Sequence, residues 1–261
     1  MEVLVQGGRY SATFGLVLAA VAVRLLAACG DDARAVCGNG VVESGEACDT
    51  GGLPGLCTRD CGWARVSLDR PGTATRPSVA VTAGGCIVVG YQFTPDGSLT
   101  AQAEAVVYDR TGAAIWGPSR LLESDEAQGN VAVSGLGECG FAAVWDQGQE
   151  MDRDIYGRVF PTGELDSAPG AVRLNEDSSG DRYEPALAVV GGGRVVAAWT
   201  ALYLDGDEAS VAARFLDAEL AGQEPEFVAN TYTQGPQERP AVAGCAEKVL
   251  LVWQSKCQEY G

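Results

Sequence analysis

Apolar residues recur along this chain in short runs that end in an aromatic side chain at a fixed interval. The aromatic residues are Tyr91, Trp145, Trp199 and Trp253, each 54 residues after the one before it. The runs themselves, such as Phe141-Ala-Ala-Val-Trp145, are apolar at successive positions rather than at alternate ones. A strand with that pattern is buried on both faces. The fixed interval therefore predicts a repeated β-unit whose second strand lies between two neighbouring sheets.

Each unit also contains signals for three further strands. A short alternating strand precedes the apolar run, and in most units a proline opens it, which is acceptable where no ladder donor is needed. A Gly-rich turn leads into the apolar run, and a polar, acidic loop leads out of it to a third strand and a shorter fourth segment. In one unit the predicted strands are 185–189, 195–199, 211–215 and 227–230. Four short strands in about 50 residues are typical of a propeller blade.

We therefore expect residues 64–261 to form an all-β, β-propeller-like array of four-stranded blades with a repeat of about 54 residues. The recurring pattern Pro-Ala-Val-Ala, then Val-Trp, Arg-Phe and Asn resembles blade-like repeats of large bacterial surface proteins, which implies the same fold. A β-sandwich or a stacked β-array is the alternative. The last unit has only strands 240–243 and 248–254, and its third strand would fall near position 268. We expect either a chain that continues beyond residue 261 or an incompletely closed ring of about four blades.

The N-terminus carries a short apolar stretch, residues 14–22, which is too short to span a bilayer but fits a signal peptide. It leads into Leu26-Ala27-Ala28-Cys29, which resembles the lipobox of bacterial lipoproteins. That resemblance implies removal of residues 1–28, lipidation of Cys29, a linker over 29–36 and anchoring in the cell envelope, with Gly30 favouring the outer membrane. An ordinary secretory signal is the alternative. Under either interpretation the chain is exported, and disulfides are permissible.

A small cysteine-rich module is predicted over residues 37–61, because four cysteines in this exported segment indicate two disulfides whose pairing stays open. A zinc site is the less favoured alternative. The phrase Cys37-Gly-Asn-Gly-Val-Val-Glu-Ser-Gly-Glu-Ala-Cys48-Asp49 resembles the Myxococcus cysteine-rich repeat, which implies a surface module of a myxobacterial-type envelope protein. Asn39, Glu43 and Asp49 offer oxygen ligands that suit calcium, although turns and solvated carboxylates are the favoured explanation. The four cysteines are Cys37, Cys48, Cys57 and Cys61.

Four further cysteines lie in the repeat region. Cys86 and Cys139 both stand at the start of a second strand, so we expect them to face one another across neighbouring blades. Cys245 and Cys257 would pair across a hairpin or near a ring closure. In the cell envelope all four are disulfide candidates.

The composition excludes several classes of function. The net charge of −17 repels phosphate backbones, so a nucleic-acid partner is not expected. The chain contains no histidine, which excludes Ser-His-Asp and Cys-His catalysis and histidine-ligated metals. Carboxylates are the main remaining candidates for chemistry.

Acidic residues gather in the loops that follow the second strands. Asp205 and Asp207 have the oxygen density that calcium prefers, and a pair of such carboxylates also suits acid–base catalysis on a glycoside. A solvated acidic loop is the favoured explanation for these groups. Tyr203 and Tyr232 on the same rim can stack on sugar rings or simply pack. The acidic residues are Asp146, Glu150, Asp152 and Asp154 in one unit and Asp205, Asp207 and Glu208 in the next.

The main functional hypothesis from the sequence is a non-enzymatic, lipid-anchored envelope protein that binds a glycan or a protein through its propeller rim. It has no catalytic residue and no cofactor other than calcium. The alternative is a secreted carbohydrate-active enzyme that uses acidic loop residues of the rim. That alternative predicts that Asp152→Asn or Asp207→Asn abolishes activity without loss of the fold.

Overall fold

The structure is a computed structural model that describes residues 3–6, 70–163, 165–245 and 248–256. The lipidation site Cys29, the cysteine module over 37–61 with its calcium candidates, and Cys257 lie outside the described residues, and what we expect of them stays a prediction. No helix in the described ranges is long and apolar enough to cross a membrane.

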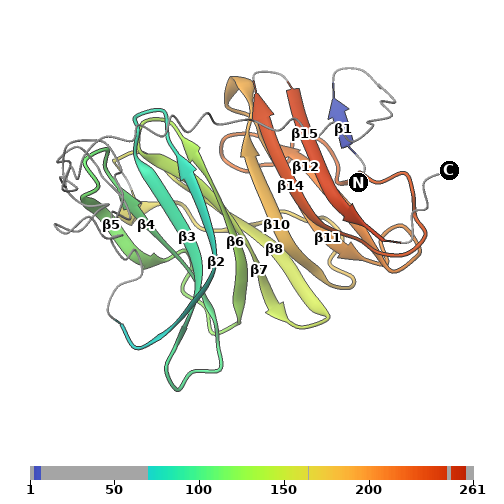
Figure 1. The fold of residues 1–261 in the computed structure, drawn as a ribbon, viewed down its shortest axis with the longest axis horizontal. Helices are drawn as coiled ribbons and strands as arrows, with labels where there is room; N and C mark the ends of the chain where they lie inside the picture. Colours follow the sequence, from blue (N-terminus) through green and yellow to red (C-terminus); the bar gives the residue numbers. More distant parts are fainter. Residues whose placement is uncertain (1–2, 7–69, 164, 246–247, 257–261) are drawn as a thin grey trace, which may run out of the picture. The chain divides into compact units, whose positions relative to one another are not determined.

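Four antiparallel sheets follow one another along the chain (Figure 1). Blade 1 contains β2 (Gly72–Val81), β3 (Ile87–Pro95), β4 (Gln102–Tyr108) and β5 (Ala114–Arg120). Blade 2 contains β6 (Gln128–Leu136), β7 (Gly140–Gln149), β8 (Asp152–Phe160) and β9 (Val172–Arg173). Blade 3 contains β10 (Arg182–Val189), β11 (Val195–Leu202), β12 (Ala209–Leu216) and β13 (Phe227–Val228). Blade 4 contains β14 (Gln237–Cys245), β15 (Lys248–Ser255) and β1 (Val3–Gln6).

The second strand of each blade forms the core of the array. Residues of β7 and β11 are buried almost throughout. Trp145 lies in one apolar cluster with Val88 of β3, and Trp199 lies in another with Val144 of β7. Trp253 packs in the same way against residues of β11 and β12. Each tryptophan therefore fills the space between its own blade and the preceding one, which explains why the apolar runs have no polar face.

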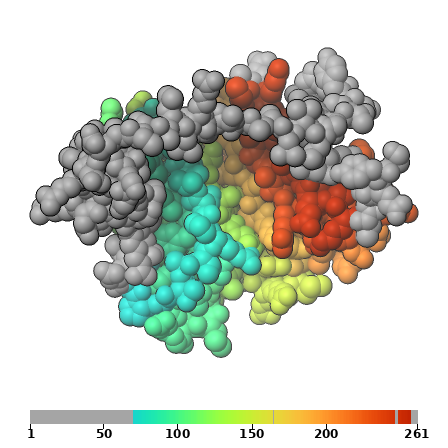
Figure 2. All heavy atoms as spheres, in the orientation of Figure 1, coloured from blue at the N-terminus to red at the C-terminus, as the bar shows by residue number. Residues whose placement is uncertain are grey.

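The first strands of the blades contact one another in chain order, β2 with β6, β6 with β10 and β10 with β14. Figure 2 shows one face of the molecule, with atoms of β2 and β3 in cyan and those of β14 and β15 in red. Because the blades repeat, equivalent positions on the first strands are brought side by side. The predicted all-β array of four-stranded, propeller-like blades is confirmed.

The disulfide between Cys86 and Cys139 is also confirmed, with their Cα atoms 5.3 Å apart. Cys86 immediately precedes β3 and Cys139 immediately precedes β7, so the bond joins blade 1 to blade 2. Cys245 is exposed and carries a free thiol, and it forms no disulfide with any described residue.

Blade 4 takes its third strand from the other end of the chain. Strand β1 pairs antiparallel with β15, in the register Val3 with Val252 and Gln6 with Val249. This differs from the sequence analysis, which removes residues 1–28 as a signal peptide and expects either a third strand near position 268 or an incompletely closed ring. The pairing has a simple physical reason, because β15 would otherwise present an open edge of unpaired backbone groups.

Candidate functional site

The first strand of every blade carries a β-bulge at the same place. In each blade the pairing between first and second strands shifts register there, and a residue other than glycine takes a left-handed backbone conformation. Such a conformation is uncommon for residues with a Cβ, and bulges re-aim side chains, often beside functional sites. The four residues are Arg76 (φ +52°), Asn130 (φ +47°), Glu184 (φ +53°) and Arg239 (φ +57°).

Hydrogen bonds and an ion pair connect these bulges from blade 1 to blade 4, with Asp146 as an intermediate partner. Arg76 donates a hydrogen bond from Nη1 to Oδ1 of Asn130, and Asn130 Nδ2 lies 2.5 Å from Oδ2 of Asp146. The same Asp146 oxygen accepts a hydrogen bond from the backbone N–H of Glu184 at 3.1 Å. Arg239 Nε lies 3.5 Å from Oε1 of Glu184. We call Arg76, Asn130, Asp146, Glu184 and Arg239 the bulge cluster.

A glycine makes room for the buried acid of the cluster. Asp146 stands near the end of β7, where it pairs with Gly129 of β6. A Cβ at position 129 would lie 3.0 Å from Oδ1 of Asp146 and 3.1 Å from Oε1 of Gln92. Gly129 therefore allows the carboxylate to sit between blades 1 and 2, within reach of Asn130.

The two carboxyl groups of the cluster have raised pKa values. Burial raises the pKa of Asp146, which is 3% exposed, against the hydrogen bonds donated by Asn130 and Glu184. Burial also raises the pKa of Glu184, whose side chain is 26% exposed. The positive charge of Arg239 opposes that shift, whereas the charges of Glu238 and Asp146 add to it. Glu184 is therefore a carboxyl group that keeps its proton to higher pH than an ordinary glutamate while remaining open to solvent.

A second set of polar contacts supports the cluster from blades 2 and 3. Arg153 binds Asp181 with Nε at 2.8 Å and Nη2 at 2.5 Å, and its guanidinium lies 4.6 Å from the centre of the Tyr183 ring. Burial and the charges of Glu238 and Glu184 raise the pKa of Tyr183 to about 12. These contacts hold the backbone that leads into Glu184, because Asp181 and Tyr183 stand just before it on the chain.

The acidic residues singled out in the next loop make local hydrogen bonds. Asp205 accepts hydrogen bonds from Asn230 Nδ2 at 2.9 Å and from the N–H of Asp207 at 3.2 Å, and Asp207 accepts one from the N–H of Gly235 at 3.0 Å. Within the described ranges no group of three or more His, Cys, Asp or Glu residues is placed to hold a metal ion. The two aspartates therefore connect the loop between β11 and β12 to the segment between β13 and β14. Calcium binding by Asp205 and Asp207 stays a prediction.

Sequence reasoning found one member of the bulge cluster and missed four. Asp146 is one of the acidic candidates that follow a predicted second strand, whereas Asp152 and Glu150, from the same group, are exposed near the tip of the β7–β8 hairpin. The missed residues each stand immediately before the residue that opens a predicted first strand, at intervals of 54, 54 and 55 residues. That position in the repeat is the signal that could have identified them: Arg76, Asn130, Glu184 and Arg239.

No protein-family model matches the chain, and no curated protein matches it. Two solved structures have a similar fold. An endo-arabinase from Bacteroides thetaiotaomicron superimposes with a TM-score of 0.52 and 12% identity, over 76% of this chain and 77% of that chain. A protein of unknown function from Dyadobacter fermentans superimposes with a TM-score of 0.53 and 12% identity, over 75% of this chain and 62% of that chain.

The likeness is one of fold. At 12% identity it does not transfer an activity, but it corrects our main functional hypothesis. We expected a non-enzymatic binding module, and the comparison contradicts that interpretation, because the array shares its fold with an endo-arabinase. Between the two hypotheses drawn from the sequence, the comparison favours the carbohydrate-active enzyme.

Proposed function

We propose that this chain is a carbohydrate-active enzyme that cleaves glycosidic bonds at the bulge cluster. The observation that carries the proposal is the state of Glu184, a partly exposed carboxyl group with a raised pKa, aimed by a left-handed bulge. A general acid in glycoside hydrolysis needs these properties, because it must be protonated at the working pH and must reach the leaving oxygen. The fold shared with an endo-arabinase makes a furanose- or pyranose-containing polysaccharide the first substrate class to examine.

The neighbouring residues have separate roles in this proposal. Glu184 donates its proton to the oxygen of the departing sugar. Burial is the main cause of its raised pKa, and the charge of Asp146 adds to the shift. Hydrolysis needs a second carboxylate that activates water, and we assign this role to Glu238, whose side chain is 20% exposed. The charge of Glu238 also raises the pKa of Glu184. Arg76 and Arg239 are exposed and can donate hydrogen bonds to sugar hydroxyl groups.

We also propose that the enzyme works outside the cytoplasm, held in the bacterial envelope by a lipid on Cys29, after a cleavage before Cys29 that removes β1 from blade 4. The support is the lipobox-like sequence before Cys29 together with the Cys86–Cys139 disulfide, since disulfides persist in oxidising compartments. Metabolic labelling with a radioactive or clickable fatty acid tests this, with Cys29→Ser as the variant that should take up no label.

Release of reducing ends from a panel of polysaccharides that includes arabinan tests the proposed activity. The wild-type chain should release oligosaccharides from at least one member of the panel. Glu184→Gln should reduce the rate by about 10²–10⁴-fold, the usual contribution of a general acid. Glu150→Gln, which changes an exposed acid on the β7–β8 hairpin, should leave the rate unchanged. Absence of turnover by the wild type on every member would overturn the proposal.

A further inference from the structure

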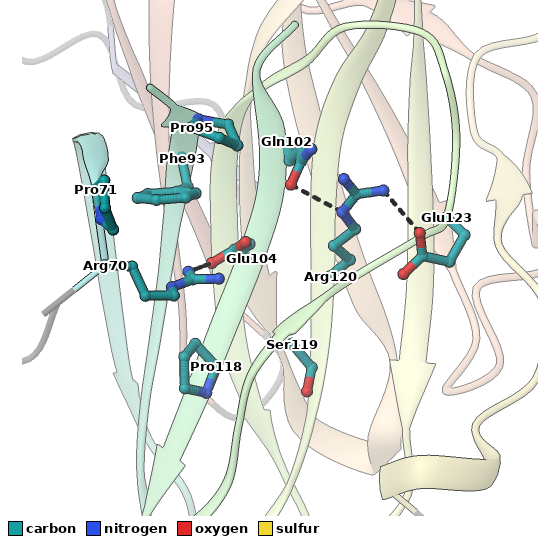
Figure 3. Close-up of a pocket in the computed structure, with 10 residues that line it drawn as sticks. All are labelled: Arg70, Pro71, Phe93, Pro95, Gln102, Glu104, Pro118, Ser119, Arg120 and Glu123. Atoms are coloured by element: carbon teal, nitrogen blue, oxygen red, sulfur yellow. Dashed lines mark hydrogen bonds and ion pairs between the residues drawn. The ribbon is translucent and has the colours of Figure 1, made fainter. Parts of the chain in front are cut away.

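A separate pocket of about 630 Å³ lies on blade 1 (Figure 3). It is formed by the segment before β2, the end of β3, the start of β4 and the end of β5 with the residues that follow. Its volume is within the range of about 300–1,000 Å³ that is typical of small-molecule sites. None of the residues that line it belongs to the bulge cluster.

The charges in this pocket are paired within it. Arg70 forms an ion pair with Glu104, whose side chain is 3% exposed, and this contact raises the pKa of Arg70. On the other side of β4, Arg120 donates from Nη1 to Oε2 of Glu123 at 2.7 Å. Arg120 also donates from Nε to Oε1 of Gln102 at 2.8 Å. Two arginines and two glutamates therefore leave the pocket with no net formal charge.

The remaining lining consists of Phe93, three prolines and Ser119. The Arg70 guanidinium lies 4.2 Å from the centre of the Phe93 ring, which is 6% exposed. Pro71, Pro95 and Pro118 also line the pocket (Figure 3) and offer C–H surface without a backbone N–H donor. The pocket thus combines fixed donors and acceptors with flat apolar surface.

We infer that this pocket is a second carbohydrate site that binds a neutral sugar. A hydroxyl group both donates and accepts hydrogen bonds, so neighbouring hydroxyls of one sugar ring can satisfy an arginine and a carboxylate together. An anionic ligand would have to displace the buried Glu104 from Arg70, and a cationic ligand would have to displace Arg70 from Glu104, each at a cost in a broken charge-assisted bond. The C–H faces of a sugar can pack against the surfaces of Pro71, Pro95 and Pro118. The pocket would hold substrate at a distance from the bulge cluster, and this role rests on the proposed function.

Calorimetric titration of the full chain carrying Glu184→Gln, which prevents hydrolysis, tests this inference. The probes are arabinohexaose, xylohexaose and cellohexaose, with a galacturonate hexasaccharide as the charged counterpart. At least one neutral hexasaccharide should bind more tightly than the galacturonate. Arg120→Ala should weaken that binding by about tenfold or more, the effect of losing hydrogen bonds to a charged group. Arg110→Ala, an exposed arginine of the same blade, should leave it unchanged.

The outcomes separate this inference from the proposed activity. If Arg120→Ala weakens binding but the wild type shows no turnover, the inference about the pocket stands and only the proposed enzymatic activity is overturned. Three results would overturn the inference about the pocket. The first is that no neutral hexasaccharide binds, and the second is a preference for the galacturonate hexasaccharide. The third is binding that Arg239→Ala removes and Arg120→Ala does not change. Thermal melts of the variants check that each is folded.

Discussion

The backbone N–H of Glu184 donates a hydrogen bond to the carboxylate of Asp146, which lies on the preceding blade, at 3.1 Å. This contact places two carboxyl groups with raised pKa values in one cluster, one buried and one partly exposed. It also joins the bulge of blade 3 to the second strand of blade 2. The chemistry that we propose depends on this arrangement and on the fold that holds it.

Asp146→Asn should shift the pH dependence of activity toward acid. The charge of Asp146 raises the pKa of Glu184, so its removal lowers that pKa. Because a general acid works in its protonated form, the rate falls as pH rises through this pKa, and the fall should begin at lower pH in the variant. The pH profile of kcat/KM on the best substrate measures the shift. An alkaline limb that does not move would mean that Asp146 has no electrostatic effect on the catalytic acid.

The stability of the Glu184→Gln variant, compared with that of the wild type at the same pH, should be greater at pH 7 than at pH 4. The folded-state pKa of Glu184 is raised, so its contribution to stability is present below its unfolded pKa and is lost as pH rises through the folded pKa. The amide does not ionise and does not lose this contribution. The difference in Tm between variant and wild type should therefore become more positive from pH 4 to pH 7. A difference that is constant with pH would contradict the raised pKa, and Glu150→Gln provides the comparison for an exposed acid.

Trp199→Ala should destabilise the array strongly. Trp199 is fully buried between blades 2 and 3, and loss of a buried tryptophan typically costs about 3–5 kcal/mol. Leu99→Ala, at a fully exposed position, should change the free energy of unfolding by less than about 0.5 kcal/mol. Urea unfolding followed by circular dichroism measures both. Equal effects of the two substitutions would contradict the packing of the tryptophan between blades.

Removal of the disulfide by Cys86→Ala with Cys139→Ala should cost about 2–4 kcal/mol, because the bond closes a loop of 53 residues and restricts the unfolded chain. Cys245→Ser, which changes an exposed free thiol, should have little effect. Thermal unfolding of both variants, with and without reductant, measures the contribution. A wild type whose Tm does not respond to reductant would indicate that the bond does not form.

The fold was largely predictable from the sequence, whereas the site was only partly so. The tryptophans at a fixed interval predict the blades because a strand between two sheets must be apolar on both faces, and the equivalent positions of Cys86 and Cys139 predict their bond. The bulge residues differ in chemistry from blade to blade, and a single sequence does not reveal that Glu184 adopts a left-handed conformation. The pairing of β1 with β15 joins segments about 245 residues apart, which no local pattern predicts.

The most direct test of the central claim is to measure how the rate loss caused by Glu184→Gln depends on the leaving group. If Glu184 protonates the departing oxygen, the variant should lose about 10²–10⁴-fold in rate on a natural glycosidic bond. On an aryl glycoside whose dinitrophenolate departs without a proton, it should retain a rate close to that of the wild type. An equal loss on both substrates would contradict the assignment of Glu184 as the general acid.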